Sequence, residues 1–205
     1  MKIICIGMNY SGHNNELGNT LIKQTNPVVF LKPDSAILRN RRPFFLPDFS
    51  NRIEYETEIV IRIDKLGKNI DEKFAYRYWD VLTVGIDFTA RDMQEEFRSE
   101  GLPWELCKAF DSSAVIGDFV PKERYSDAQS LHFNLNINGE TVQKGYTGDM
   151  TFSIEKIISF VSCYFTLRTG DLIFTGTPAG IGPTSIGQHF EGYIEEDKLL
   201  DFHIR

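Results

Sequence analysis

The sequence predicts a mainly β fold of the α+β class. Strand-like segments with Gly and Asn turns are interrupted by a few helical stretches, without the regular alternation that a parallel βαβ sheet requires. The aromatic content also favours strands, because the 205 residues include 16 Phe and 8 Tyr but only 2 Trp. A chain of this length suits one domain with a substantial core, so we expect residues 1–205 to fold as a single domain.

The clearest element in the first half of the chain is a strand at 52–64. Ile, Tyr and Thr alternate there with mostly charged residues, which is the two-residue period of a β-strand. The other elements expected in this half are strands at 2–7 and 26–33, a loop or short helix at 9–17, an irregular stretch at 34–50, a helix at 71–79 and a buried strand at 81–87.

The second half is expected to begin with a helix. Thr89 and Asp92 have the spacing of a capping box at its start, and Gly101 is placed to end it. Further along, Asn138-Gly139 predicts a β-hairpin within the segment HFNLNINGETV. The remaining expected elements are a helix at about 152–162 and a strand in LIFTGTP at 172–178.

The charge pattern excludes two classes of partner. The formal net charge is −7, from 22 basic and 29 acidic residues, and no run of Lys or Arg is present. An acidic chain of this kind has no electrostatic footprint for nucleic acid or for an anionic membrane. It is compatible with binding a divalent cation.

The cysteines and the first residues indicate a cytoplasmic protein. Cys5, Cys107 and Cys163 are odd in number and far apart, which argues against a disulfide framework or a zinc ribbon and favours a reducing compartment. Only four apolar residues in a row follow Lys2, fewer than a signal peptide or a membrane span requires.

Acidic residues supply the first candidate site. Glu54, Glu56 and Glu58 share one face of the 52–64 strand, at backbone spacings of roughly 6.5–7 Å, from which carboxylates can converge on a cation. The alternative is a solvent-exposed face, although like charges on one strand face repel one another. Asp87 ends a buried strand just before a helix, where it is either a ligand or a helix cap.

Several other polar residues have spacings that suit catalysis. Arg91 and Gln94 lie three residues apart near a helix start, and an arginine with an amide can bind a substrate carboxylate. His13 and Glu16 have the same spacing, which would let a carboxylate orient an imidazole base. For both pairs the alternative is ordinary surface.

Two further segments can contribute to a site. Lys108 lies in the apolar segment GLPWELCKAF and can stabilise an oxyanion, or its stem can simply pack on a neighbour while its ammonium reaches water. The loop FTGTPAGIGP (174–183) completes no dinucleotide-binding motif, but its backbone N–H groups and the Thr177 hydroxyl can meet a small anion.

Taken together, these segments resemble the fumarylacetoacetate hydrolase family, and its small acylpyruvate hydrolase and oxaloacetate decarboxylase-like branch in particular. The matching motifs are IGMNYSGHNNE (6–16), FLKP (30–33), YETEIVI (55–61), GIDFTARDMQ (85–94), GLPWELCKAFD (101–111) and GDLIFTGTPAGIGP (170–183). Their order along the chain is specific to the family, whereas each motif alone is a weak signal.

The resemblance implies a fold and a set of site residues. It implies a mixed, strongly coiled β-roll with few helices, usually in a homodimer, and an N-terminal lid over about residues 1–20. The implied residues are Glu56, Glu58 and Asp87 as ligands of Mg²⁺ or Mn²⁺ (Ca²⁺ being an alternative), His13 and Glu16 as the catalytic dyad, Lys108 as the active-site lysine, and Arg91, Gln94 and Thr177 near the substrate. Glu54 falls outside the ligand pair, and Met8 stands where the family usually has Arg.

The function that follows is a metal-dependent hydrolase that cleaves a C–C bond in acylpyruvates or related 2-oxo acids. In this hypothesis His13 activates a water, the water attacks the distal carbonyl, and Lys108 shares the charge of the departing pyruvate enolate. Decarboxylation of oxaloacetate would need the same enolate but no water attack. The alternatives are an isomerase or tautomerase of 2-oxo diacids at the same site, and a non-catalytic metal-binding protein.

Overall fold

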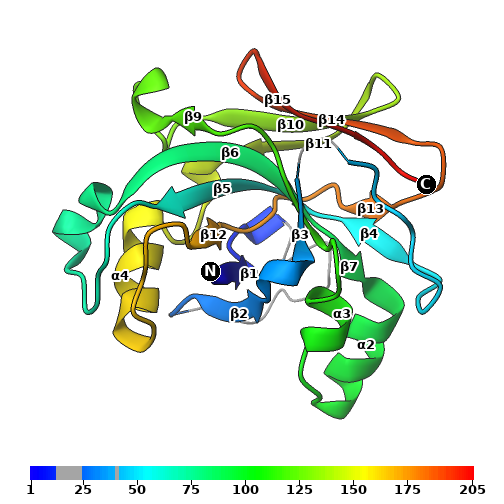
Figure 1. The fold of residues 1–205 in the computed structure, drawn as a ribbon, viewed down its shortest axis with the longest axis horizontal. Coiled ribbons are helices and arrows are strands. Elements are labelled where there is room, and N and C mark those ends of the chain that lie inside the picture. The colour runs from blue at the N-terminus through cyan, green and yellow to red at the C-terminus, as the bar shows by residue number, and fades with distance from the viewer. Residues whose placement is uncertain (13–24, 40–41) are drawn as a thin grey trace.

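A large mixed sheet forms the centre of the computed structural model, which describes residues 1–12, 25–39 and 42–205 (Figure 1). Its strands are β1 (Ile3–Gly7), β2 (Val28–Lys32), β3 (Ile37–Leu38), β5 (Thr57–Ile63), β6 (Trp79–Asp87), β8 (Ala114–Ile116), β9 (Val120–Pro121) and β12 (Leu172–Phe174). They are arranged in the order β2-β1-β12-β5-β6-β8-β3, with β9 pairing with β6. The pairs β1–β12 and β3–β8 are parallel and the other pairs are antiparallel, so the sheet is mixed.

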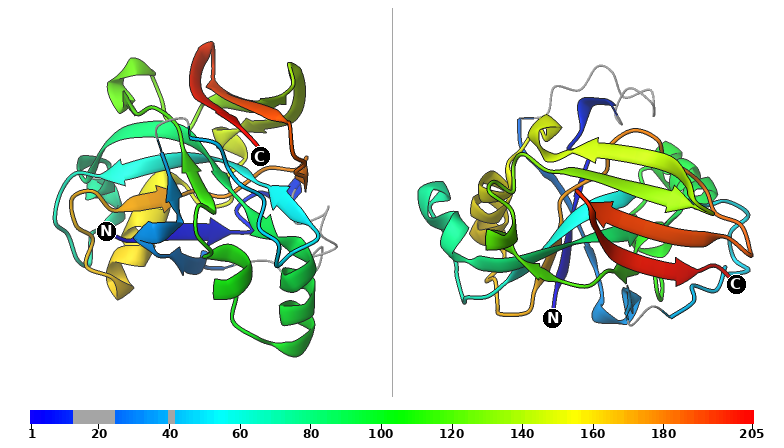
Figure 2. Two further views of the ribbon diagram at one scale, coloured as in Figure 1. Left: turned by 45° about the vertical axis from the view of Figure 1, so that its right-hand side comes forward. Right: turned by 90° about the horizontal axis from the view of Figure 1, so that it is seen from above.

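Two smaller sheets complete the β structure. One is antiparallel, in the order β11-β10-β14-β15, and consists of β10 (His132–Ile137), β11 (Glu140–Tyr146), β14 (His189–Ile194) and β15 (Asp197–His203). The other consists of β4 (Ile53–Tyr55), β7 (Thr89–Ala90) and β13 (Gly182–Pro183). The antiparallel sheet lies across the curved β5–β6 pair (Figures 1 and 2). The mainly β, mixed and curled architecture predicted from the sequence is confirmed.

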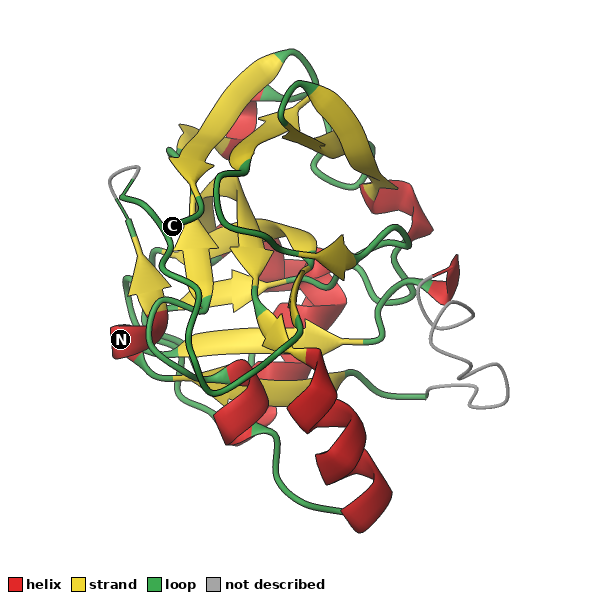
Figure 3. Ribbon diagram, turned by 90° about the vertical axis from the view of Figure 1, so that its right-hand side faces the viewer, coloured by secondary structure: helices red, strands yellow, loops and turns green. Residues whose placement is uncertain are grey.

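Short helices lie at the margins of the sheets. In the described residues the α-helices are α2 (Arg91–Glu100), α3 (Glu105–Lys108) and α4 (Ile154–Tyr164), and the 3-10 helices are η1 (Asp34–Ala36), η2 (Glu72–Arg77), η3 (Lys122–Arg124) and η4 (Thr147–Asp149). Helices α2 and α3 project together from one end of the molecule (Figure 3). Among the described residues, no helix is long and apolar enough to cross a membrane.

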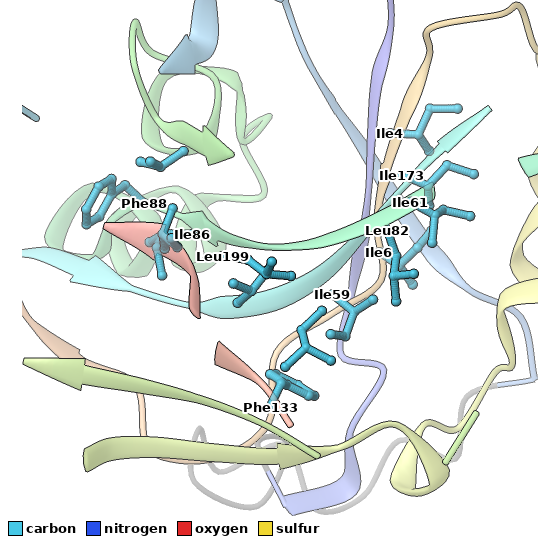
Figure 4. Close-up of a cluster of buried hydrophobic side chains, with 14 of the residues drawn as sticks. Ile4, Ile6, Ile59, Ile61, Leu82, Ile86, Phe88, Phe133, Ile173 and Leu199 are labelled. Carbon is cyan, nitrogen blue, oxygen red and sulfur yellow. The ribbon is translucent and has the colours of Figure 1, made fainter. Parts of the chain in front are cut away.

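The core lies between the large sheet and the antiparallel sheet. Ile59 and Leu82 from the β5–β6 pair are fully buried, and Phe133 from β10 approaches them from the other layer (Figure 4). Each fully buried aliphatic or aromatic side chain of this kind stabilises the fold by about 1.5–3 kcal/mol. This layer therefore holds the central strands in place.

The segment 52–64 differs from the single alternating strand that its sequence predicts. It is divided at Glu56 into β4, which pairs with β7 and β13, and β5, which pairs with β6 and β12. Glu56 and Glu58 are only 5% and 2% exposed, so the face expected to carry charge is buried as well. The reading of these glutamates as a solvent-exposed face is therefore wrong.

Of three predicted turns and helix ends, two are confirmed and one is wrong. The hairpin at Asn138-Gly139 is confirmed, because both residues adopt the positive φ of a tight turn, 52° and 86°. The helix α2 ends at Gly101 (φ 71°), as expected. The capping box is wrong: Ala90 is the N-cap residue and no side chain caps the helix, since the Thr89 hydroxyl is bound elsewhere.

Candidate active site

Three carboxylates converge where β4, β5 and β6 meet. Glu56 lies between β4 and β5, Glu58 is the second residue of β5, and Asp87 ends β6. The backbone N–H of Asp87 donates to the carbonyl of Glu56 at 2.8 Å, which aligns the two strands at this point. Each of the three side chains offers a carboxylate oxygen, and these oxygens lie within 4.8 Å of one another. All three residues are buried, so the cluster is a candidate cation site rather than a surface feature.

Two buried lysines contact this cluster. The Lys108 ammonium donates to Glu56 Oε2 at 2.8 Å, to Asp87 Oδ2 at 3.0 Å and to the Thr89 hydroxyl at 2.6 Å. Burial alone would lower the pKa of Lys108, but Asp87 and Glu56 outweigh it and raise the pKa, so the group stays charged. Lys32 at the end of β2 lies 2.7 Å from Asp87 Oδ1 and also donates to the Ser113 hydroxyl at 2.9 Å.

Arg91 holds the acidic residues from the side of α2. Its Nε donates to Glu54 Oε2 at 2.6 Å and its Nη2 to Glu56 Oε1 at 2.5 Å, while Nη1 donates to Gln94 Oε1. Three of the five guanidinium N–H groups are thus engaged within the protein. Glu54, which the resemblance places outside the ligand pair, binds Arg91 and so helps to hold Arg91 against Glu56.

Glu58 differs from the other two carboxylates in its partners. Within the described part of the chain it has no ion pair, and its Oε2 accepts a hydrogen bond of 2.7 Å from the Gly176 N–H. Burial, followed by the charges of Asp87 and Glu56, raises the pKa of Glu58 well above its usual range. The ionised form of Glu58 is therefore unfavourable without a cationic partner. A divalent cation would stabilise it, and a donor set of carboxylate oxygens suits Mg²⁺, Mn²⁺ or Ca²⁺. The residues present therefore fit such an ion.

The loop after β12 is fixed against β5 by Gln143 from β11. Gln143 Oε1 accepts from the Thr57 N–H at 3.0 Å, and its Nε2 donates to the Thr177 hydroxyl at 2.8 Å and the Pro178 carbonyl at 2.9 Å. The Thr177 hydroxyl in turn donates to the Thr57 carbonyl at 2.9 Å. Because Thr57 separates Glu56 from Glu58, this amide helps to set the backbone that presents both glutamates.

A glycine is required in the same loop. Gly176 has φ 103°, and a Cβ there would lie 2.7 Å from the Cβ of Asn9. Asn9 is fully buried and its amide donates to the Thr175 carbonyl at 2.8 Å and the Phe152 carbonyl at 3.1 Å. The N-terminal motif and the loop that contacts Glu58 are thus packed together.

A small polar cavity opens onto the cluster, next to a larger apolar groove. The cavity has a volume of about 60 Å³ and is lined by Ile6, Gly7, Met8, Phe30, Glu56, Glu58, Arg91, Gln94, Arg98, Trp104, Lys108 and Thr177. The groove, of about 800 Å³, lies between β2, the segment before α3 and the end of α4. Phe30 and Trp104 line both spaces and form an edge-to-face pair with centroids 6.0 Å apart. This pair therefore forms the wall between them.

Most site residues expected from the sequence come together. Glu56, Glu58, Arg91, Gln94, Lys108 and Thr177 line the cavity, and Asp87 contacts Lys108. His13 and Glu16 lie outside the described residues. The sequence interpretation missed Lys32, Thr89 and Gln143. Lys32 had a local signal, a lysine closing an apolar strand within FLKP, whereas Gln143 had none because its partners are far away in sequence.

These features define a buried polar pocket whose carboxylates fit a divalent cation. The chain belongs to the fumarylacetoacetate hydrolase family: the family model described as fumarylacetoacetate (FAA) hydrolase C-terminal matches residues 2–204. It is accordingly an enzyme of this family, as the motifs indicated.

Named relatives span different reactions. Mitochondrial oxaloacetate tautomerase FAHD1 of Mus musculus is 40% identical over 204 residues, covering 100% of this chain and 91% of its own length. The structure of fumarylpyruvate hydrolase from Pseudomonas aeruginosa in complex with Mn²⁺ and pyruvate matches with a TM-score of 0.93 at 32% identity, covering 100% of this chain and 89% of that one. The 5-carboxymethyl-2-hydroxymuconate delta-isomerase of Mycobacterium smegmatis matches with a TM-score of 0.86 at 29% identity, covering 99% and 78%.

Proposed function

We propose that this protein is a divalent-metal-dependent enzyme that cleaves a C–C bond in acylpyruvates by way of a pyruvate enolate. The observation that carries the proposal is the buried convergence of Glu56, Glu58 and Asp87 beside the Lys108 ammonium. Hydrolase, decarboxylase and tautomerase reactions of 2-oxo acids all pass through an enol or enolate, so a site that stabilises negative charge on the 2-keto oxygen suits each of them.

The three carboxylates would hold the ion. When bound, the ion supplies Lewis-acid polarisation of the carboxylate and 2-keto oxygens of the substrate. Lys108, held between Glu56 and Asp87, can exchange its hydrogen bond to the Thr89 hydroxyl for one to the developing enolate oxygen. Arg91 keeps Glu56 in place by binding the other carboxylate oxygen, Oε1.

We assign water activation to His13, oriented by Glu16. The imidazole takes a proton from water, the hydroxide oxygen bonds to the distal carbonyl carbon, and the bond between that carbon and C3 of the pyruvate moiety breaks. The electron pair of that bond becomes the enolate of pyruvate, and a proton then returns to C3. Arg91, Gln94 and Thr177 line the cavity and are assigned to substrate positioning.

The second candidate is tautomerisation of oxaloacetate, favoured by the 40% identity to the mouse tautomerase over the whole chain. That reaction needs proton transfer at C3 and no attacking water. It would therefore use Lys108 and the three carboxylates but would depend less on His13.

The test is a turnover screen of acetylpyruvate, fumarylpyruvate and oxaloacetate with Mg²⁺, Mn²⁺ or EDTA, followed by NMR in D₂O. Hydrolysis yields pyruvate and the free acid, whereas tautomerisation yields only deuterium at C3. We expect His13→Ala to lose far more hydrolysis than C3 exchange, and Lys108→Gln to lose both. Lys144→Gln, on the exposed part of β11, is the matched control. Folded, metal-loaded protein that releases no pyruvate from any acylpyruvate would overturn the hydrolase proposal.

Three finer features belong to the same proposal. We take Mg²⁺ as the ion used in the cell, residues 1–205 as one catalytic domain with a lid over about residues 1–20, and a cytoplasmic homodimer as the working form. Metal analysis of the protein as purified tests the first, and limited proteolysis with and without substrate analogue tests the second. Sedimentation and cell fractionation test the third.

A further inference from the structure

A second group of metal-ligating side chains lies on the outer face of the β14–β15 pair, away from the carboxylate cluster. His189 lies directly opposite His203, and Glu191 directly opposite Asp201, in the register of the two strands. The intervening Phe190 and Phe202 are buried in the core. The alternation of the strands thus places two imidazoles and two carboxylates together on one face.

The side chains already contact one another. One ligand atom from each of His189, Glu191 and Asp201 lies within 4.8 Å of the others. His189 Nε2 is 2.8 Å from Asp201 Oδ1, and the His203 ring stacks on the His189 ring with centroids 4.4 Å apart. Lys198 completes the group by donating to Glu191 at 3.1 Å and to Asp201 at 2.9 Å.

We propose that His189, Glu191 and Asp201 form a second, zinc-type metal site, with His203 beside it. An imidazole with two carboxylates selects borderline ions such as Zn²⁺, in contrast to the all-carboxylate cluster that suits Mg²⁺. Ligand atoms around tetrahedral zinc are about 3.4 Å apart, given metal–ligand distances of about 2.0–2.1 Å. Small side-chain rotations therefore suffice, because the paired strands already fix the backbone.

The Lys198 ammonium marks where the cation would bind. It occupies the space between the two carboxylates that a dication would take. Zinc binding requires the ammonium to move aside, and Lys198 is therefore a competitor of the metal.

Calorimetric titration with Zn²⁺, in the presence of saturating Mg²⁺ to fill the carboxylate cluster, tests this proposal. We expect one equivalent of zinc to bind to the full chain and His189→Ala to weaken binding at least tenfold. Lys198→Ala should tighten it several-fold, because the competing ammonium is gone. His132→Ala is the matched control, since His132 is exposed on the same sheet but stacks on Tyr146 instead.

A second measurement separates this site from the first. Glu58→Gln, which alters only the carboxylate cluster, should leave zinc binding unchanged, and melting curves of all variants check that they are folded. The visible d–d absorption bands of bound Co²⁺ depend on its ligands. They should change in His189→Ala, which lacks the imidazole ligand, and stay the same in His132→Ala. The proposal is overturned if His189→Ala binds zinc as tightly as the parent chain, or if zinc binding disappears in Glu58→Gln.

Discussion

Replacing Gln143 by Met removes a buried amide while nearly conserving volume. The amide makes three hydrogen bonds, to the Thr57 N–H, the Thr177 hydroxyl and the Pro178 carbonyl. Each is worth about 1 kcal/mol net, and the Thr57 N–H is left buried without this partner, so we expect a loss of about 3 kcal/mol in unfolding free energy. With a urea m-value of about 2 kcal/mol/M, the unfolding midpoint falls by about 1.5 M.

The same substitution should also affect ligand binding. Thr57 lies between Glu56 and Glu58, so the variant should bind Mn²⁺ at least tenfold more weakly in calorimetry, and KM should rise more than kcat falls. Gln188→Met is the control, because among the described residues the Gln188 amide accepts one hydrogen bond, from the Ser185 backbone N–H in the turn before β14. If Gln143→Met unfolds at the same urea concentration as the parent chain and binds Mn²⁺ equally well, the positioning role assigned to this amide is refuted.

Three further predictions concern the site and its wall. Because the pKa of Glu58 is raised in the folded protein, ionising Glu58 lowers the free energy of unfolding as pH rises above about 4.3. Without metal, Glu58→Gln should therefore melt at a higher temperature than the parent at pH 8 and at the same temperature near pH 4. Mn²⁺ should raise the melting temperature of the parent only, and an equal rise in both proteins would contradict the assignment of Glu58 as a ligand. Lys32→Met removes the 2.7 Å ion pair to Asp87 but leaves the one from Lys108, so it should cost about 1–3 kcal/mol in urea unfolding, and a neutral result would argue against a structural role. Trp104→Ala joins the cavity to the groove and should raise kcat/KM several-fold for long-chain over short-chain acylpyruvates, whereas an unchanged ratio would exclude Trp104 from specificity.

Much of the fold follows from local pattern. The strand β6, the hairpin at Asn138-Gly139 and the end of α2 at Gly101 are specified by apolar runs and turn residues within a few positions of one another. The division at Glu56 was not foreseen, because the two-residue alternation continues through it. The reason for the division lies in contacts with later parts of the chain. At Glu56 the chain passes from the sheet that contains β7 to the sheet that contains β6, and Arg91 and Lys108 bind the Glu56 side chain.

The site was predicted unevenly for a related reason. Residue type and strand position pointed to Glu58 and Asp87, but spacing alone left a capping or solvent role open. Thr89 was read as a helix cap because its spacing to Asp92 fits one, yet its hydroxyl is taken by Glu56 and Lys108. Contacts between residues far apart in sequence leave no local pattern to read.

The shared wall of Phe30 and Trp104 separates two parts of the molecule that are built differently. The acidic cluster is embedded in hydrogen-bonded central strands, where any change disturbs folding and chemistry together. The groove beyond the wall is bounded by short connecting segments and strand ends, whose side chains can be exchanged at little cost to the core. New substrate preferences should therefore arise by remodelling that outer chamber, while the chemical step is inherited unchanged.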